Sequence, residues 1–208
     1  MQAQAATTKP ISPHNPHLAA LEGGEEPEYI VWIVVAVVLA LGLFLMLFIT
    51  NQTSVANAGQ TTLSYPSTWV ATSEKGAAFA VADLKGGGTF GDRVAVFQLA
   101  KTDLLPGQGG LTEAAGNWSF REQGSRVGYR SLSVQTNKVG DKDAVTVESG
   151  YLMDSPYGAT TMPALMHAYD TVVQSGNNFY VLHYATASQD NDHAKSTDDK
   201  LVSSWRVP

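Results

Sequence analysis

The stretch "NFYVLHYATA", residues 178–187, decides the fold of this chain. In an extended strand, successive side chains point to opposite faces. One face would carry Phe179, Val181, His183 and Ala185, and the other Tyr180, Leu182 and Tyr184. Both faces are largely apolar, and a strand of this kind is covered on both sides. The stretch therefore predicts the central strand of a sheet with another layer packed on each face.

The rest of the domain supplies further strands and the covering helices. Strands are predicted at 77–84, 92–100, 129–136, 142–153 and 164–173, the last two closing hairpins with their neighbours. Helices are predicted at 111–123, with Thr112 as N-cap, and within 190–207. The predicted fold class is an α+β domain, residues 61–208, in which helices sandwich an antiparallel sheet (α/β/α). The tryptophans expected in its core are Trp69, Trp118 and Trp205.

The domain opens with "LSYPSTW" (63–69) and closes with "FYVLHYATASQDNDHAKSTDDKLVSSWRV" (179–207). The first resembles the "yPxxW" start of the PsbP family, the extrinsic, lumen-side subunits of photosystem II and their bacterial relatives. The second is similar to the end of that family: a strand, a polar helix and Ser-Ser-aromatic. The resemblance implies an antiparallel sheet between helices and an accessory, non-catalytic role beside a membrane complex. It carries over no metal-binding or other site residue.

A long apolar segment precedes the domain, in "EYIVWIVVAVVLALGLFLMLFITN" (28–51). Its 20 residues from Ile30 to Ile49 carry no charge, and as a helix they would span about 30 Å, the thickness of a bilayer core. A secretory signal has a shorter apolar run behind a basic start, whereas the flank here is acidic. The "VANA" that follows leaves cleavage open. We predict a retained transmembrane helix at 30–50 and a linker at 51–60, although most PsbP relatives are secreted or lipid-anchored.

The topology and packing of this helix follow from its flanks and its small residues. Neither flank carries Lys or Arg close to the membrane. A short N-terminus before a helix and a larger domain is typical of a signal anchor in the inner or plasma membrane. We therefore expect a single-pass protein with a cytoplasmic N-terminus and a periplasmic domain. Ala36 and Ala40 form a small-xxx-small pair that permits packing against a partner helix; a generic anchor is the alternative.

Residues 1–29 are predicted to be an extended N-terminal tail. The segment is rich in Ala, Pro, Gly, Thr and Glu and poor in apolar residues. Such a segment orders only along a partner surface. The side chains expected to insert into a partner are His14, His17 and Leu18.

Composition excludes several classes of function. Nucleic acid is not an expected partner, because the formal net charge is −6 and no basic patch is present. Nucleotide is not expected either, because the dinucleotide fingerprint does not occur in the setting that it requires. The chain has no cysteine, which rules out disulfides, thiolate metal sites and iron–sulfur clusters. The apolar helix has no ionisable residue that could ligate haem or relay protons. No cofactor is predicted.

The remaining motifs are better explained by structural roles than by ligand or metal binding. "GGGTFG" (86–91) matches a dinucleotide fingerprint, but a strand follows it where that fingerprint needs a helix. A hairpin that turns at Gly176 would place His183 opposite Tyr169 and diagonal to His167, with Asp170 on the other face. Two separately hydrogen-bonded histidines are favoured over a shared metal. In "QDNDH" (189–193), Asp190 or Asp192 is expected to cap the last helix.

Two functions are compatible with these features. The first is a non-catalytic accessory subunit of an energy-converting membrane complex, respiratory or photosynthetic, held by one helix. The alternative is a free-standing, membrane-anchored binding module for a small ligand or an envelope protein. No catalytic set of residues is visible, so we expect that the protein is not an enzyme.

Overall fold

The computed structural model describes residues 28–50, 52–83, 90–101, 110–154, 162–188 and 191–208. The chain divides into two compact units, one ending at Phe48 and the other comprising Ile49–Pro208. Most of helix α2 (Glu28–Thr50) lies in the first unit, and its last two residues fall in the second. The second is the folded domain, and each unit is described by itself below.

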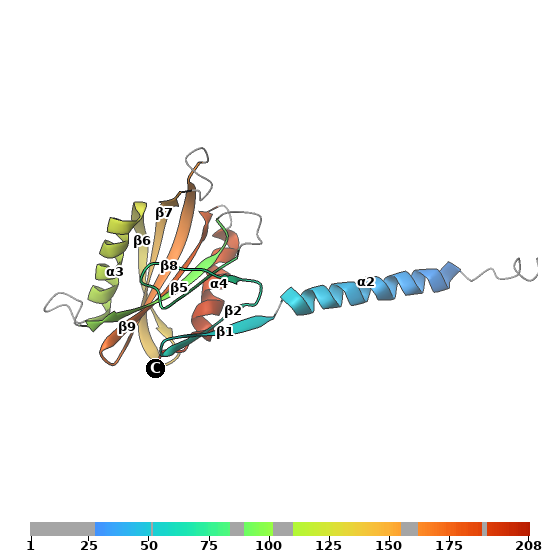
Figure 1. The fold of residues 1–208 in the computed structure, drawn as a ribbon, viewed down its shortest axis with the longest axis horizontal. Helices are drawn as coiled ribbons and strands as arrows, with labels where there is room; N and C mark the ends of the chain where they lie inside the picture. Colours follow the sequence, from blue (N-terminus) through green and yellow to red (C-terminus); the bar gives the residue numbers. More distant parts are fainter. Residues whose placement is uncertain (1–27, 51, 84–89, 102–109, 155–161, 189–190) are drawn as a thin grey trace, which may run out of the picture. The chain divides into compact units, whose positions relative to one another are not determined.

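The domain contains a small and a large antiparallel sheet (Figure 1). A hairpin is formed by β1 (Thr53–Ala58) and β2 (Thr61–Pro66). The seven-stranded sheet has the order β3-β4-β5-β9-β8-β7-β6. Its strands are β3 (Val70–Ala71), β4 (Phe79–Ala82), β5 (Arg93–Ala100), β6 (Val127–Val139), β7 (Lys142–Met153), β8 (Ala164–Ser175) and β9 (Asn178–Ala187). The helices of the domain are α3 (Leu111–Ser125) and α4 (Asn191–Ser204).

Strand β9 is the middle strand of the large sheet, as its two apolar faces predicted. It pairs with β5 on one side and with β8 on the other. Phe179 and Val181 lie in a core cluster with residues of α3, while Tyr180 and Leu182 lie in a second cluster with residues of α4. The helices therefore cover opposite faces, and the predicted α/β/α arrangement is confirmed (Figure 1).

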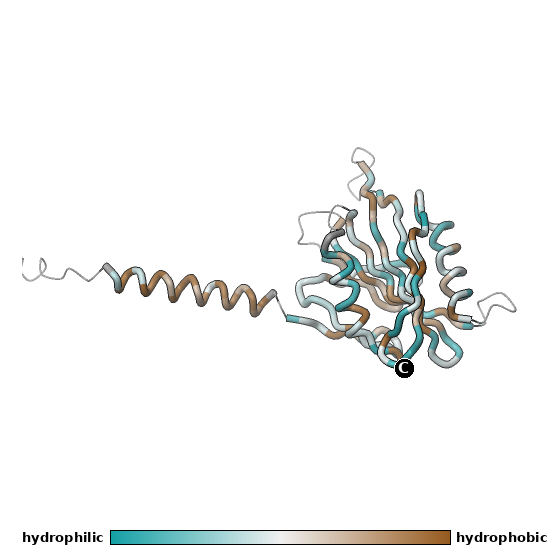
Figure 2. Tube along the Cα trace, turned by 180° about the vertical axis from the view of Figure 1, so that it is seen from behind, coloured by the Kyte–Doolittle hydropathy of each residue, from teal (hydrophilic) through white to brown (hydrophobic). Residues whose placement is uncertain are grey.

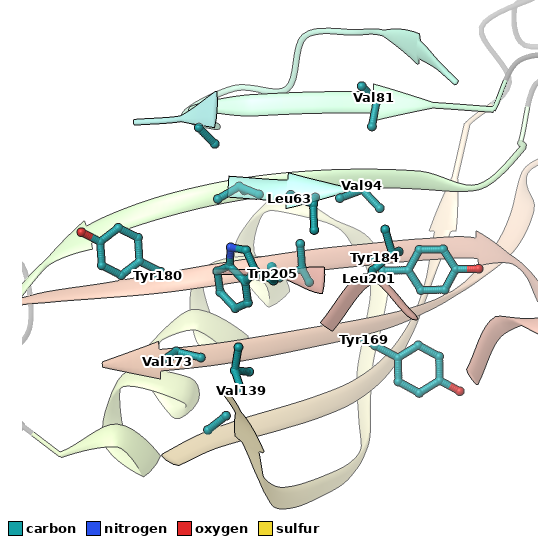
Figure 3. Close-up of a cluster of buried hydrophobic side chains, with 14 of the residues drawn as sticks. Leu63, Val81, Val94, Val139, Tyr169, Val173, Tyr180, Tyr184, Leu201 and Trp205 are labelled. Carbon is teal, nitrogen blue, oxygen red and sulfur yellow. The ribbon is translucent and has the colours of Figure 1, made fainter. Parts of the chain in front are cut away.

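The core on the α4 side is built around Trp205, which is fully buried (Figure 3). The β1–β2 hairpin closes this core, because Leu63 of β2 is buried in the same cluster. An isolated bridge between Thr62 and Arg206 ties the hairpin to the end of the chain. The core on the α3 side centres on Trp118, whose ring lies 4.7 Å from that of Phe97. Both tryptophans are buried as predicted, and so is Trp69.

The prediction of a linker at 51–60 is wrong, because most of this segment forms strand β1. Residues Ala56 and Ala58 of β1 are buried, whereas Val55 and Asn57, which alternate with them, are exposed. The alternation is that of a strand with one covered face, but small residues give it a weak apolar signal in the sequence. Only pairing with β2 reveals it.

The predicted cap of helix α3 is also wrong. The helix begins at Leu111, so its N-cap is Gly110, which makes no side-chain cap hydrogen bond. Thr112 lies inside the first turn, where the backbone is already helical. Glu113 in that turn places a negative charge near the positive end of the helix dipole.

Helix α2 is apolar along its length (Figure 2). Its residues Tyr29–Ile49 are long and apolar enough to cross a membrane. A signal sequence near an N-terminus would have the same properties, so α2 is a candidate anchor. Ala36 and Ala40 lie one turn apart on it, and both are exposed.

Trp205→Ala should lower the free energy of unfolding by about 3–5 kcal/mol, the usual cost of truncating a buried aromatic side chain. Denaturant unfolding of the full chain, followed by far-UV circular dichroism, measures the change. Leu132→Ala, at a side chain that is 58% exposed, is the control and should change stability by less than about 0.5 kcal/mol. An equally small effect of Trp205→Ala would show that α4 does not depend on this core.

Candidate functional site

A buried polar network lies on the α3 face of the large sheet, where the covering helix ends. Asp170 of β8 and His183 of β9 are direct cross-strand partners, both about 1% exposed. Their side chains are joined by a hydrogen bond of 2.7 Å between Nδ1 of His183 and Oδ1 of Asp170. The other ring nitrogen of His183, Nε2, lies 3.3 Å from Nη2 of Arg126. Arg126 directly follows α3 as its C-cap residue, so the network joins two strands and a helix end.

Arg126 connects this pair to two further carboxylates. Its Nε donates to Glu122 of α3, and its Nη2 donates to Glu74 at 2.7 Å. The guanidinium also lies over the ring of Tyr151, 4.4 Å from the ring centroid. Glu74 comes from the segment between β3 and β4, so Arg126 fastens that segment to the end of α3.

The hydrogen bonds determine which nitrogen of His183 carries the proton. A guanidinium only donates, so Nε2 of His183 must accept from Arg126. The proton then sits on Nδ1 and is donated to Asp170. An Asp–His pair can act as a general base only through a free Nε2. Here Arg126 occupies that nitrogen, so the arrangement suits a structural role.

The electrostatics of the network favour a permanent cation at Arg126. Burial by itself would lower the pKa of Arg126, but Tyr151 and the two carboxylates outweigh it and raise this pKa. Burial also raises the pKa of the Tyr151 hydroxyl to about 12, against the opposing effect of Arg126. The guanidinium stays charged and the phenol stays neutral at physiological pH.

A second polar cluster lies on the α4 face, over β6, β7 and β8. Glu148 of β7 accepts two hydrogen bonds, from Ser133 at 2.7 Å and from His167 at 2.8 Å. Next to it, Thr146 shares hydrogen bonds with Asn137 and Thr171, of 2.9 and 2.8 Å. The side chains bound a cleft of about 90 Å³, whose lining residues are Ser133, Gln135, Asn137, Thr146, Glu148, Tyr169 and Lys195. The cleft is polar but small, since ordinary ligand pockets measure about 300–1,000 Å³, so it could admit only a very small polar molecule.

Helix α4 forms one wall of this cleft through Lys195. The ammonium of Lys195 lies 2.6 Å from Asp199, 3.5 Å from Asp198 and 5.6 Å from the centre of the Tyr169 ring. Asp198 is only 2% exposed. Its burial raises its pKa to about 6, although Lys195 opposes the shift.

The predicted register of the β8–β9 hairpin is wrong by one residue. His183 lies opposite Asp170, and Tyr169 lies opposite Tyr184. The loop has two residues, Gly176 and Asn177, rather than a turn centred on Gly176, and the positive φ of Gly176 (58°) suits such a loop. A slip of one residue moves a side chain to the other face, which is why Asp170 was placed away from His183.

The two histidines are separately hydrogen-bonded, as favoured from the sequence. His167 bonds to Glu148 on the α4 face, and His183 bonds to Asp170 on the α3 face. They therefore share no ligand. Within the described ranges, no group of three or more His, Asp or Glu side chains is placed to hold a metal ion.

Several predicted features lie outside the described residues. They are the docking side chains His14, His17 and Leu18, the capping residue Asp190 and most of the 86–91 glycine motif. Asp192 lies inside α4 and is not its cap. Gly91 is described, and a Cβ there would collide with the backbone of Asp83. Strand β5 follows the glycine motif, so the helix that a dinucleotide fingerprint requires is absent from this position.

Sequence reasoning missed Arg126 and Asp170 as parts of a network. The Gly-Asn dipeptide at 176–177 was a usable signal, since it favours a two-residue hairpin loop and so the true register. Nothing in the sequence indicates that Glu74 and Arg126 meet, because they are far apart along the chain.

Known proteins resemble this chain in fold rather than in sequence. No model of a protein family matches the chain, and no curated protein matches it. The solution structure of PsbP from the cyanobacterium Synechocystis sp. PCC 6803 (CyanoP) is similar, with a TM-score of 0.54 at 16% identity. The match covers 76% of this chain and 92% of CyanoP. The domain therefore has a PsbP-like fold, as the two end motifs implied.

Two further solved structures resemble the chain less. LpqN of Mycobacterium tuberculosis, involved in cell envelope biogenesis, has a TM-score of 0.48 at 13% identity, covering 74% of this chain and 89% of LpqN. The Ran-binding protein Mog1p of Saccharomyces cerevisiae has a TM-score of 0.47 at 9% identity, covering 75% and 95%. These similarities are too weak to support an inference about this chain.

Arg126→Ala should lower the free energy of unfolding by about 3–5 kcal/mol, because it leaves the buried Glu122 and the partly buried Glu74 without their cation. Arg126→Lys should recover only part of this loss, since an ammonium cannot reproduce the forked donors of a guanidinium. Arg130→Ala, at an exposed arginine nearby, is the control. Denaturant unfolding measures all three variants, and equal values for Arg126→Ala and Arg130→Ala would contradict a structural role for the network.

Asp198 should make the domain less stable as pH rises. Its pKa is raised from 3.8 to about 6 by burial, so the folded state binds the proton more tightly than the unfolded state. The stabilisation is fully present below about pH 4 and is lost as pH rises through about 6. Asp198→Asn should remove this loss, and unfolding curves between pH 4 and pH 7 compare the two proteins. If the free energy of unfolding changed equally with pH in the unaltered chain and in Asp198→Asn, Asp198 would not titrate in this way.

Proposed function

We propose that this protein is a non-catalytic accessory subunit of an energy-converting membrane complex, respiratory or photosynthetic. The observation that carries the proposal is a PsbP-like domain placed directly behind a candidate membrane span. The fold and the helix fit a membrane-anchored accessory module, and the complex that it serves is the proposed part. CyanoP is named as the cyanobacterial member of PsbP, which makes a photosynthetic complex one of the two candidates.

The short connection between helix and domain supports this role. Only residues 51 and 52 separate the end of α2 from the start of β1. In the proposed topology, the N-terminus is cytoplasmic and the domain lies on the periplasmic side of the inner or plasma membrane.

The polar clusters are consistent with a protein that is not an enzyme. The basic nitrogen of His183 is occupied by Arg126, and both oxygens of Glu148 accept hydrogen bonds within the fold. Groups committed in this way must break their hydrogen bonds before they can exchange protons with a substrate. The pattern suits side chains that hold a shape for binding.

Two elements outside the domain are the proposed contacts with partner subunits. Ala36 and Ala40 would let a partner helix approach α2 closely. The tail of residues 1–29 would lie along a partner, with His14, His17 and Leu18 inserted. Deleting residues 2–20 tests the tail in the same co-purification assay that tests the helix.

Ala36→Leu combined with Ala40→Leu should reduce co-purification of partner subunits in mild detergent several-fold, because larger side chains block close helix packing. Val34→Leu combined with Val38→Leu changes the opposite face of α2 and is the matched control. Native purification followed by identification of the bound subunits is the measurement. Membrane insertion should be equal for both pairs, and unchanged association of the alanine variant would make α2 a simple anchor.

The polar cleft on the α4 face favours the alternative, a free-standing anchored module that binds a small ligand. Its 90 Å³ volume and its convergent hydroxyl, amide and carboxylate groups are the specific observation. Purification that yields the chain without other subunits, together with a small molecule released on denaturation, would favour this alternative. A stable complex with respiratory or photosynthetic subunits would favour the first proposal.

A further inference from the structure

A groove of about 330 Å³ runs beside the buried network, between the end of α3 and the segment that follows β3. Its lining residues are Glu74, Lys75, Phe97, Arg121, Glu122, Ser125 and Arg126. Phe97 is buried at its base. The groove is therefore bounded by charged side chains with an aromatic ring below them.

The cations of this groove exceed its anions. Its lining carries three cations, Lys75, Arg121 and Arg126, against two carboxylates, a net charge of +1. Both carboxylates, Glu74 and Glu122, lie within salt-bridge distance of Arg126. In the part of the chain that the structure describes, Lys75 and Arg121 are paired with no carboxylate. The chain as a whole has a net charge of −6, so a groove with surplus positive charge stands out against an acidic protein.

Arg126 is held in place before any ligand arrives, and Arg121 lies against an aromatic ring. Arg126 donates hydrogen bonds to Glu122, Glu74 and His183. Asp170 in turn orients His183 through a hydrogen bond. The guanidinium of Arg121 lies 5.4 Å from the centre of the Trp118 ring. Donors that are already positioned lose little entropy when they bind.

The turn that carries Lys75 also leaves room for Arg121. Gly76 has a positive φ of 83°, and its neighbour Ala77 donates a backbone hydrogen bond of 3.1 Å to Glu74. A Cβ at position 76 would lie 3.2 Å from Nη2 of Arg121. Glycine therefore serves both the turn and the close approach of the guanidinium.

We propose that this groove receives a carboxylate side chain of an acidic segment on a partner protein. Lys75 and Arg121 supply the surplus charge, and Arg126 adds donors that the network behind it has oriented. A singly charged carboxylate fits better than a doubly charged phosphate, because Glu74 and Glu122 at the same groove repel the additional charge. The proposal rests on the proposed function, since it names the chemistry by which a partner subunit would dock.

The test is the binding of a tetraglutamate peptide to the full chain in detergent micelles, followed by amide NMR at low salt. The peptide should shift the resonances of Lys75 and Arg121, and Lys75→Gln combined with Arg121→Gln should weaken binding at least about tenfold. Arg130→Gln combined with Lys138→Gln removes the same charge from strand β6 and should leave binding unchanged. All four residues are exposed, so both double variants should fold.

Each other outcome overturns the proposal. Equal weakening in both double variants would mean that the peptide responds to overall charge. No weakening in the groove variant would place the peptide elsewhere. Inorganic phosphate that shifts the same resonances at lower concentration than the peptide would make the groove a phosphate site.

Co-purification separates this proposal from the proposed function. If the groove variant loses both the peptide and the partner subunits, the groove is the docking site. If it loses the peptide but keeps the partners, the accessory role stands and docking through this groove is rejected. If the unaltered chain binds the peptide but brings no partner subunits, the accessory role fails while the carboxylate groove stands.

Discussion

The burial of strand β9 on both faces is the constraint on which the rest of the domain depends. A strand with Phe179 and Val181 on one face and Tyr180 and Leu182 on the other needs two separate apolar layers. Helix α3 supplies one layer, and α4 with the β1–β2 hairpin supplies the other. The remaining strands then extend the sheet on both sides until the edges at β3 and β6 are reached.

The same burial explains the polar network. His183 lies on a strand without access to water, so each of its ring nitrogens needs a partner inside the protein. Asp170 satisfies one nitrogen and Arg126 the other. Arg126 in turn needs carboxylates because an isolated buried cation is costly. One polar residue at the centre of the sheet therefore determines contacts that extend to Glu74 at the surface.

The large sheet has two faces of different character, and each has its own consequence for binding. On the α3 face, charge is concentrated around one oriented guanidinium and continues into an open groove. On the α4 face, hydroxyl and amide groups and the ammonium of Lys195 surround Glu148 in a narrow cleft. A groove with surplus cations suits a protein partner with acidic side chains, whereas the cleft suits a small polar molecule. The groove would serve the proposed accessory role, and the cleft would serve its alternative.

The sequence by itself determined the elements whose signal is local. The strand at 178–187 and the strand at 142–153 were predicted with the bounds that the structure shows, because their apolar patterns are strong and their ends carry turn residues. The apolar helix and the central position of β9 followed from composition and from two apolar strand faces. A fold of helices around an antiparallel sheet was therefore predictable.

Only the tertiary structure decided what depends on contacts between distant residues. Residues 53–58 form a strand because they pair with β2, whereas their small side chains had favoured the prediction of a linker. A two-residue loop places Asp170 opposite His183, and the sequence-based register missed it by the single residue that reverses a face. The meeting of Glu74 with Arg126 needs the whole sheet to be assembled first. The spacing of apolar residues along the sequence indicates which residues a strand or helix buries. The partner of a buried polar group depends on long-range packing, which this spacing does not show.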